Sequence, residues 1–171
     1  LEARSRFDRE SYIIARLNRP NIIHVIDRGI SPDEMPYFVM EYVEGIDLST
    51  ASKIGEITHQ DKIDIVIQVL KALSYAHQNN VIHRDIKPDN ILIDDDGTVK
   101  ILDFGIAQFY GGETAPSDQT RIGTVMGTYN YMSPEQRDSS DNVTAKSDLY
   151  SVGVVMYELL TGKIPVGVFP A

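Results

Sequence analysis

The chain contains no cysteine, so disulfide bonds, thiolate zinc sites and a cysteine nucleophile are excluded. It has no hydrophobic run long enough to span a membrane, and its N-terminus lacks an initiator methionine and the apolar region of a signal peptide. We therefore expect an internal piece of a longer, cytoplasmic protein, without membrane contact in this segment. An anchor elsewhere in that longer protein stays open.

Positive charge is also scarce. The 16 Lys and Arg residues are outnumbered by 25 Asp and Glu residues, which gives a net charge of −9. Phosphate backbones are bound by clustered Lys and Arg, so a nucleic-acid partner is not expected. The exception is an N-terminal stretch that contains Arg4, Arg6, Arg9, Arg16 and Arg19. With 171 residues, 42% of them apolar, the chain is long enough for one good core.

The residues that carry chemistry are concentrated between positions 83 and 105. Asp85, Lys87 and Asn90 precede two short β-rich runs joined by an Asp-rich turn, and Asp103 directly follows the second run. This hairpin predicts that the carboxylates of Asp85 and Asp103 converge at neighbouring strand ends. Two acids and an amide suit a divalent metal, since Mg²⁺ takes oxygen ligands and few carboxylates.

The same residues suit phosphoryl transfer, which depends mostly on positioning and charge neutralisation. Asp85 is the candidate to accept a hydroxyl proton, and Lys87 adds a compact positive charge beside it. From the residues alone, the pattern predicts a metal and phosphate site.

The motif His-Arg-Asp-x-Lys-Pro-x-Asn at 83–90, followed by Asp-Phe-Gly at 103–105, resembles the catalytic loop and magnesium motif of protein kinases. The resemblance implies an α+β, bilobal kinase fold and an enzyme that uses ATP and Mg²⁺ to phosphorylate protein Ser and Thr hydroxyls. Self-phosphorylation is compatible with this activity. The lysine at position 87, within the motif, is typical of serine/threonine kinases rather than tyrosine kinases. The sequence at 131–136 resembles that of bacterial members of the family.

The resemblance also assigns roles to single residues. Asp85 is implied as the proton acceptor, within a catalytic set of Asp85, Lys87, Asn90 and Asp103. Asn90 and Asp103 are implied as the metal ligands. The implied ATP-binding residues are Met40, Glu41, Val43, Lys87, Asn90, Leu92 and Asp103.

Upstream segments fit the same family. Helical spacing from about 5 to 17 predicts a helix, in which Glu10 matches the glutamate that pairs with an ATP-binding lysine. The β-rich runs at 22–30 and 37–43 predict an antiparallel pair. In the resemblance, Met40 takes the gatekeeper position and Glu41 to Val43 form the hinge. An ordinary surface Glu10 and a core Met40 remain the alternatives.

Three later helices complete the pattern. Residues 45–48 are predicted to open a short helix, and a capping box at Thr58 starts a longer one from about 59 to 78. Its apolar stripe is predicted as Ile63, Val66, Ile67, Leu70 and Leu73. Helix F is predicted at about 146–161, where the resemblance implies that Asp148 accepts hydrogen bonds from the catalytic-loop backbone. A helix-dipole role is the alternative for Asp148.

Three features have competing interpretations. His77 is favoured as a packed or capping residue over a metal ligand, because no second His or carboxylate shares its spacing. The Asp-rich segment at 94–97 lacks the distal Glu of a calcium loop, so a hairpin turn is favoured. The resemblance implies that His83 packs on the Phe104 ring, and we favour that role over a general base.

Regulation is predicted in the segment after 105. The resemblance implies that Arg84 binds a phosphate there, with Thr120 as the first candidate and Thr124 as the second. Thr128 is instead implied as an unmodified hydroxyl between the Asp85 and Lys87 positions. The segment ends at 127–135 in a motif that resembles a substrate-docking platform.

The resemblance divides the chain into a partial small lobe at 1–43 (helix C, strands 4 and 5, hinge) and a partial large lobe at 44–171. The large lobe contains the catalytic loop at 83–90, the magnesium motif at 103–105, the activation segment at 103–135 and helix F. The Gly-rich phosphate loop and its lysine partner do not occur in the sequence. We therefore expect these 171 residues alone to bind Mg-ATP poorly.

Two other functions compete with an active kinase. A non-catalytic pseudokinase-like binding module is motivated by the missing glycines and lysine. A small-molecule phosphotransferase shares the Asp, Asn and Asp set but leaves the platform at 127–135 unexplained.

Overall fold

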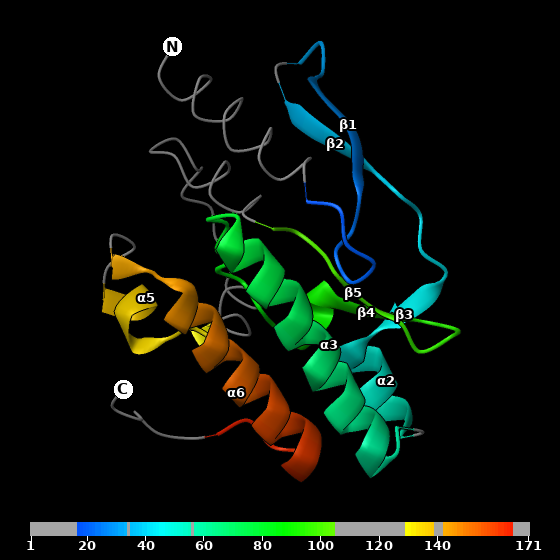
Figure 1. Cartoon of the computed structure of the whole chain (residues 1–171), viewed down its shortest axis with the longest axis vertical. Helices are drawn as coiled ribbons and strands as arrows, with labels where there is room; N and C mark the ends of the chain where they lie inside the picture. Colours follow the sequence, from blue (N-terminus) through cyan, green and yellow to red (C-terminus); the bar gives the residue numbers. More distant parts are fainter. Residues whose placement is uncertain (1–16, 34, 56, 105–128, 139–141, 166–171) are drawn as a thin grey trace.

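The computed structural model describes residues 17–33, 35–55, 57–104, 129–138 and 142–165. Within these ranges, two small antiparallel sheets lie beside a set of helices, which confirms the α+β class (Figure 1). The predicted helix at 5–17, with Glu10, lies outside the described residues. In the described ranges, no helix has the length and apolar character needed to cross a membrane.

The first sheet is a hairpin of β1 (Val25–Ile30) and β2 (Pro36–Met40). Its strands are antiparallel, as predicted, but shorter than the β-rich runs at 22–30 and 37–43. At the start of the first run, Ile22 forms a parallel bridge with Ile101 instead. The segment that precedes β1 is therefore tied to the second sheet.

The second sheet has the order β3–β4–β5, with β3 at Gly45–Asp47, β4 at Ile91–Asp94 and β5 at Val99–Ile101. The prediction that 45–48 opens a helix was wrong for its first three residues, because β4 offers them an antiparallel partner. Helix α2 (Leu48–Ile54) begins only where the Asp47 side chain accepts a hydrogen bond from the Thr50 N–H.

The turn between β4 and β5 is a hairpin turn, as predicted. The Asp94 N–H donates to the Thr98 carbonyl at 3.0 Å, and Gly97 adopts a φ of 78°, a left-handed conformation that favours glycine. Gln68 of α3 holds this hairpin from the side, because its side chain donates to the Gly97 carbonyl and accepts from the Val99 N–H.

Helix α3 (His59–Gln78) begins with the predicted capping box, in which the Thr58 hydroxyl and the Asp61 carboxylate bind each other's backbone N–H. The predicted apolar stripe was partly wrong, since Ile67 is 42% exposed and Leu70 is 38% exposed. At about 100° per residue these two side chains share a face that turns away from the core. The buried face is formed by Ile65, Val66, Val69, Ala72, Leu73 and Ala76.

Helix α6 (Ala145–Thr161) packs along α3 (Figure 1). Thr144 caps its N-terminus, and Gly162 ends it in the left-handed conformation. These limits match the predicted helix at about 146–161. A short helix, α5 (Pro134–Asp138), lies close to the N-terminal end of α6.

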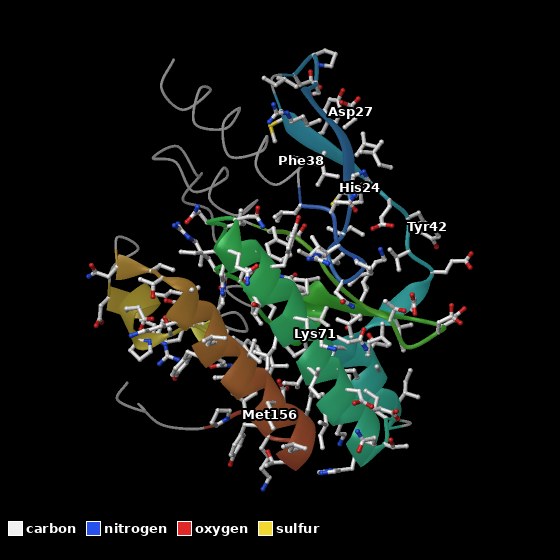
Figure 2. All side chains as sticks on the ribbon, in the orientation of Figure 1. His24, Asp27, Phe38, Tyr42, Lys71 and Met156 are labelled. Atoms are coloured by element: carbon white, nitrogen blue, oxygen red, sulfur yellow. The ribbon has the colours of Figure 1, made fainter. Side chains whose placement is uncertain are left out.

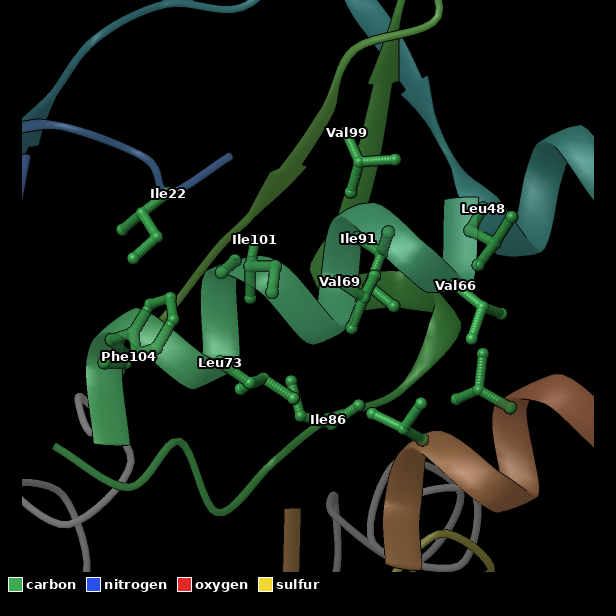
Figure 3. Packing of buried hydrophobic residues seen from close by; sticks show 14 of the residues in the cluster. Ile22, Leu48, Val66, Val69, Leu73, Ile86, Ile91, Val99, Ile101 and Phe104 are labelled. Carbon is green, nitrogen blue, oxygen red and sulfur yellow. The ribbon is translucent and has the colours of Figure 1, made fainter. Parts of the chain in front are cut away.

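The core fills the space between α3, α6 and the β4–β5 hairpin. Between α3 and β4 lies the loop that contains η1, a single 3₁₀ turn at Pro88–Asn90. Figure 3 shows the buried side chains of α3 facing those of the hairpin and the loop. The labelled ones include Val66, Val69, Leu73, Ile86, Ile91, Ile101 and Phe104. The catalytic-loop candidates are thus attached to the hydrophobic core of the described chain.

We expect Gly45→Ala to lower the free energy of unfolding by about 1–3 kcal/mol. A Cβ at Gly45 would lie 2.3 Å from the Ile93 carbonyl oxygen and 2.9 Å from Asp94 Cα. The matched control is Gly153→Ala in α6, where an added Cβ meets no described atom within 4 Å. This control should raise the stability by about 0.5–1 kcal/mol. Urea unfolding measures the stability of both variants. Equal unfolding midpoints for Gly45→Ala and the parent would contradict the close packing of β3 on β4.

Candidate functional site

The loop that begins at His83 is anchored by one buried carboxylate of α6. Asp148 is 1% exposed. Its Oδ1 accepts the Arg84 N–H at 2.8 Å, and its Oδ2 accepts the His83 N–H at 2.9 Å. His77 Nε2 lies 2.7 Å from the same Oδ2. The predicted contact of Asp148 with the catalytic-loop backbone is confirmed.

His83 is a structural residue of the loop, as predicted. Its ring meets the Phe104 ring edge to face, with centroids 4.7 Å apart. Nε2 lies 2.6 Å from the Leu102 carbonyl oxygen and Nδ1 lies 3.2 Å from the Asp85 N–H. Nε2 therefore donates and Nδ1 accepts, which describes a neutral imidazole. Complete burial lowers the pKa of His83, in agreement with that form.

Asp85, Lys87 and Asn90 are in direct contact. Asn90 Nδ2 donates to the Asp85 carbonyl oxygen at 2.8 Å and to Asp85 Oδ2 at 3.0 Å. Lys87 Nζ forms an ion pair with the same Oδ2 at 3.1 Å. The turn at η1 makes this possible because Pro88 starts it and brings Asn90 back toward Asp85. The three predicted residues are brought together in the structure.

Asp103 is joined to this group through the backbone. The Leu102 N–H donates to the Asn90 carbonyl oxygen at 2.9 Å, so Asp103 follows directly after a fixed contact with the loop. Asp103 itself has a φ of 57°, the left-handed region that few residues other than glycine adopt. Burial raises the pKa of Asp103, and the negative charge of Asp85 adds to the rise while Lys87 opposes it.

The residues fit a metal ion that arrives together with a nucleotide. Both hydrogen bonds of the Asn90 side chain to Asp85 use Nδ2, so Oδ1 is available as a ligand. In the described part of the chain, no group of three or more His, Asp and Glu side chains could hold a metal ion by itself. Mg²⁺ commonly binds through one or two protein groups and completes its coordination with substrate phosphates and water.

The predicted hinge residues lie on an irregular segment between β2 and β3, on which Figure 2 labels the exposed Tyr42. Met40 ends β2, and Val43 is half-buried. Glu41 is fixed at its backbone and side chain. Its N–H donates to the His24 carbonyl at 3.0 Å, and its Oε1 accepts from the His24 N–H and from Lys100 Nζ. Leu92 is half-buried in β4, opposite Lys100.

Sequence reasoning did not find two of these side-chain contacts, Lys100 with Glu41 and His77 with Asp148. Lys100 Nζ lies 2.7 Å from Glu41 Oε1, although the residues are separated by 59 positions. Hydrogen bonds from Lys100 and the His24 N–H lower the pKa of Glu41 despite its partial burial. The contact of His77 with Asp148 spans 71 positions. Neither pair has a local sequence signal, because spacing along the chain carries information only within a helix or a hairpin.

The end of the predicted platform is fixed to both the loop and α6. Gln136 Nε2 donates to the Arg84 carbonyl at 2.7 Å, and Ser147 Oγ donates to Glu135 Oε1 at 2.6 Å. The Tyr131 hydroxyl donates to Glu158 at 2.6 Å. Among the described residues, the Arg84 guanidinium has no recorded ion pair. Thr120, Thr124 and Thr128 lie outside the described residues.

In this arrangement one carboxylate contacts both a lysine and an amide, and a second carboxylate follows directly after the contact of Leu102 with Asn90. A sequence model of the protein kinase domain matches residues 2–168 of the chain. The chain therefore belongs to the protein kinase family.

Its relatives are named as bacterial serine/threonine kinases. The chain is 44% identical over 163 residues to the serine/threonine-protein kinase PrkC of Bacillus subtilis, of which the match covers 24%. It is 44% identical over 164 residues to PknB of Mycobacterium leprae, covering 26% of that protein. It is 42% identical over 170 residues to a probable PknB of Bifidobacterium longum, covering 24%. Each match includes 94% of this chain, which thus spans about a quarter of these relatives' length.

Proposed function

We propose that the protein containing this chain is a serine/threonine protein kinase that transfers the γ-phosphate of ATP to hydroxyl groups of proteins, its own included. The observation that carries the proposal is the position of Asn90. Its side chain binds the Asp85 carboxylate, and its carbonyl binds the residue before Asp103. One residue thus connects the proposed proton acceptor with the proposed metal ligand. The names of the relatives support serine and threonine as the acceptors.

Asp85 has the surroundings of a proton acceptor. Its Oδ2 is occupied by Asn90 Nδ2 and Lys87 Nζ, which leaves Oδ1 for the proton of a substrate hydroxyl. As the proton moves to Asp85, the hydroxyl oxygen forms a bond to the γ-phosphorus and the bond to ADP breaks. We assign to the Lys87 ammonium the stabilisation of negative charge on the transferred group.

Asn90 Oδ1 and the Asp103 carboxylate are proposed to hold Mg²⁺. When bound, the ion would supply positive charge that offsets the charge of the phosphates. The half-buried Asp103 would also gain from a cation, because partial burial and the negative charge of Asp85 raise its pKa, and a positive ion favours the ionised carboxylate.

The remaining assignments follow the same family. We propose that Met40, Glu41, Val43 and Leu92 contact the adenine ring, and that residues 1–43 and 44–171 belong to the small and the large lobe. The hinge backbone is suited to a fixed hydrogen-bonding role, because the Glu41 side chain is held by Lys100 and the His24 N–H. Glu10 is proposed to pair with a lysine upstream of this chain.

We expect Asn90→Ala and Asp103→Ala each to weaken magnesium-dependent ATP binding by about tenfold to a hundredfold, since each removes a proposed metal contact. The measurement is calorimetric titration of the full-length protein with ATP, with and without Mg²⁺. Asp33→Ala, at the exposed turn between β1 and β2, is the control and should bind like the parent. Identical Mg-ATP affinity in all three variants would remove Asn90 and Asp103 from the metal site.

We propose that phosphorylation of Thr120, or secondly Thr124, regulates the enzyme by giving Arg84 a phosphate partner. A phosphothreonine carries about −1.5 to −2 charges and forms strong hydrogen bonds with arginine. We expect mass spectrometry of the active full-length protein to find phosphate at Thr120 or Thr124, and Arg84→Ala to reduce the gain in activity that phosphorylation brings. Phosphate found at Thr128 but at neither of the others would reverse the assignment.

A direct assay separates this function from that of a non-catalytic module. The full-length protein is incubated with Mg-ATP and with a panel of basic and acidic protein substrates, and phosphate transfer to Ser and Thr is recorded. Transfer that disappears in Asp85→Asn supports the proposal. A lack of transfer to the panel and to the protein itself would reject it.

A further inference from the structure

An open cavity of about 670 Å³ lies apart from the site described above, and none of residues 83–90 or 103 lines it. Its walls come from β3, α2, the first half of α3 and the turn between β4 and β5. Figure 1 shows α2 beside the N-terminal half of α3, next to the β3–β5 sheet. We call this cavity the hairpin groove.

The hairpin groove has an aliphatic side. Five isoleucines contribute to it: Ile46, Ile54, Ile57, Ile65 and Ile93. Ile46 is 44% exposed and Ile54 is 57% exposed, so neither side chain is buried in the core. Ile46 and Ile93 are directly paired across β3 and β4, which places two aliphatic side chains on adjacent strands. Aliphatic surface that is hollowed and exposed is a common feature of binding sites.

The other side of the groove is acidic. Asp61 and Asp64 come from the start of α3, and Asp94, Asp95 and Asp96 come from the hairpin turn. Among the described residues, no Lys or Arg lines the groove. In the described chain, none of these aspartates takes part in the ion pairs of Lys87 with Asp85 and Lys100 with Glu41, or in the contact of His77 with Asp148.

The five carboxylates are only partly compensated. Asp61 and Asp94 accept hydrogen bonds from local backbone N–H groups, and Asp64 accepts from Gln60. Asp95 and Asp96 are exposed. Like charges gathered on one surface repel one another, and a partner of opposite sign relieves that repulsion. The charge of the groove therefore selects a cationic ligand, while its isoleucines select an aliphatic one.

We propose that the hairpin groove docks a segment of a partner protein in which arginine or lysine residues stand next to aliphatic residues. The cationic side chains would face Asp64, Asp95 and Asp96, and the aliphatic ones would cover Ile46 and Ile54. A metal ion gains nothing from the isoleucines, and the described residues contain no group of three or more metal-ligating side chains. A second copy of this acidic chain, with a net charge of −9, is disfavoured by repulsion.

Docking would raise the local concentration of a substrate that carries such a segment. This consequence rests on the proposed kinase function, whereas the binding itself does not. The two are separated by measuring binding without ATP and phosphate transfer in a second assay.

The binding test uses the full-length protein and a fluorescein-labelled peptide of ten residues with two arginines and two leucines among glycines and serines. Fluorescence anisotropy should show saturable binding, and Asp95→Asn/Asp96→Asn should weaken it by about fivefold or more, as expected for two exposed charge contacts. Ile54→Ser should weaken it as well. Asp33→Asn, an exposed aspartate outside the groove, is the matched control and should leave the affinity unchanged.

Two further peptides test the two halves of the proposal. Replacing the arginines by glutamates should abolish binding, and replacing the leucines by serines should weaken it. If the serine peptide binds as tightly as the parent peptide, or if Asp33→Asn weakens binding as much as the groove variants, the interaction is general charge attraction and the proposal is overturned.

In the second assay, fusing the peptide to a phosphorylatable substrate should lower KM for the parent protein and not for Asp95→Asn/Asp96→Asn, with kcat unchanged. The unfused substrate should have the same KM and kcat with the parent protein and with Asp95→Asn/Asp96→Asn. Groove-dependent binding without any phosphate transfer would reject the kinase function and keep the docking site. Phosphate transfer without groove-dependent binding would keep the kinase function and reject the docking site.

Discussion

Asp85→Asn in the full-length protein is expected to lower turnover by about a hundredfold or more, as the loss of a general base does. The amide is nearly isosteric with the carboxylate, so its side chain can still occupy the position next to Asn90 Nδ2 and Lys87 Nζ, which now surround Asp85 Oδ2. What it cannot do is take the proton of the substrate hydroxyl. The affinity for Mg-ATP should change little, because Asp85 is not among the proposed metal ligands.

The measurement is steady-state phosphate transfer together with calorimetric ATP binding. Asp89→Asn is the matched control, since Asp89 is an exposed carboxylate in the same loop. It should retain the turnover of the parent. If Asp85→Asn keeps full turnover, Asp85 has no part in the chemistry and the proposed mechanism fails, whatever the effect on binding.

Asp148→Ala is expected to lower the free energy of unfolding by about 3–5 kcal/mol, because it removes the acceptor of buried N–H groups. The N–H groups of His83 and Arg84 would lose their partner, and so would His77 Nε2. For a chain of this size the change corresponds to a fall in Tm of about 10 °C.

Asp148→Asn provides a graded comparison. The amide retains one oxygen that can accept one of the two backbone N–H groups, so its loss of stability should be smaller than that of Asp148→Ala. Asp33→Ala, on the exposed β1–β2 turn, should change Tm by no more than about 2 °C. Thermal unfolding followed by circular dichroism measures all three. Equal Tm values for Asp148→Ala and the parent would show that α6 does not anchor the loop.

Local signals predicted several elements well. The limits of α3 agree with the predicted 59–78, because the Thr58 capping box and the Asn79 that follows the helix act within a few residues. The end of α6 at Gly162 and the β4–β5 hairpin were found for the same reason. Each of these signals depends on hydrogen bonds between residues that are neighbours in the sequence.

Exposure was predicted less well than secondary structure. Ile67 and Leu70 have the spacing of an apolar helix face, yet their face turns toward solvent while Ile65 and Val69 are buried. The sequence of α3 carries apolar residues around much more than half of its circumference. Which of them is buried depends on where α6 and β5 pack, and helical periodicity contains no information about that.

The sequence by itself determined the family of this chain and the order of its chemical groups. The motifs at 83–90 and 103–105 fix which residues can accept a proton or bind a metal, because those properties belong to the side chains. The tertiary structure alone decided how those groups are held. Asp148 reaches the loop across 64 and 65 positions, Lys100 reaches Glu41 across 59, and the hairpin groove forms only where α2 and α3 meet the β4–β5 turn. Contacts over such separations arise from the packing of whole elements, which no local spacing encodes.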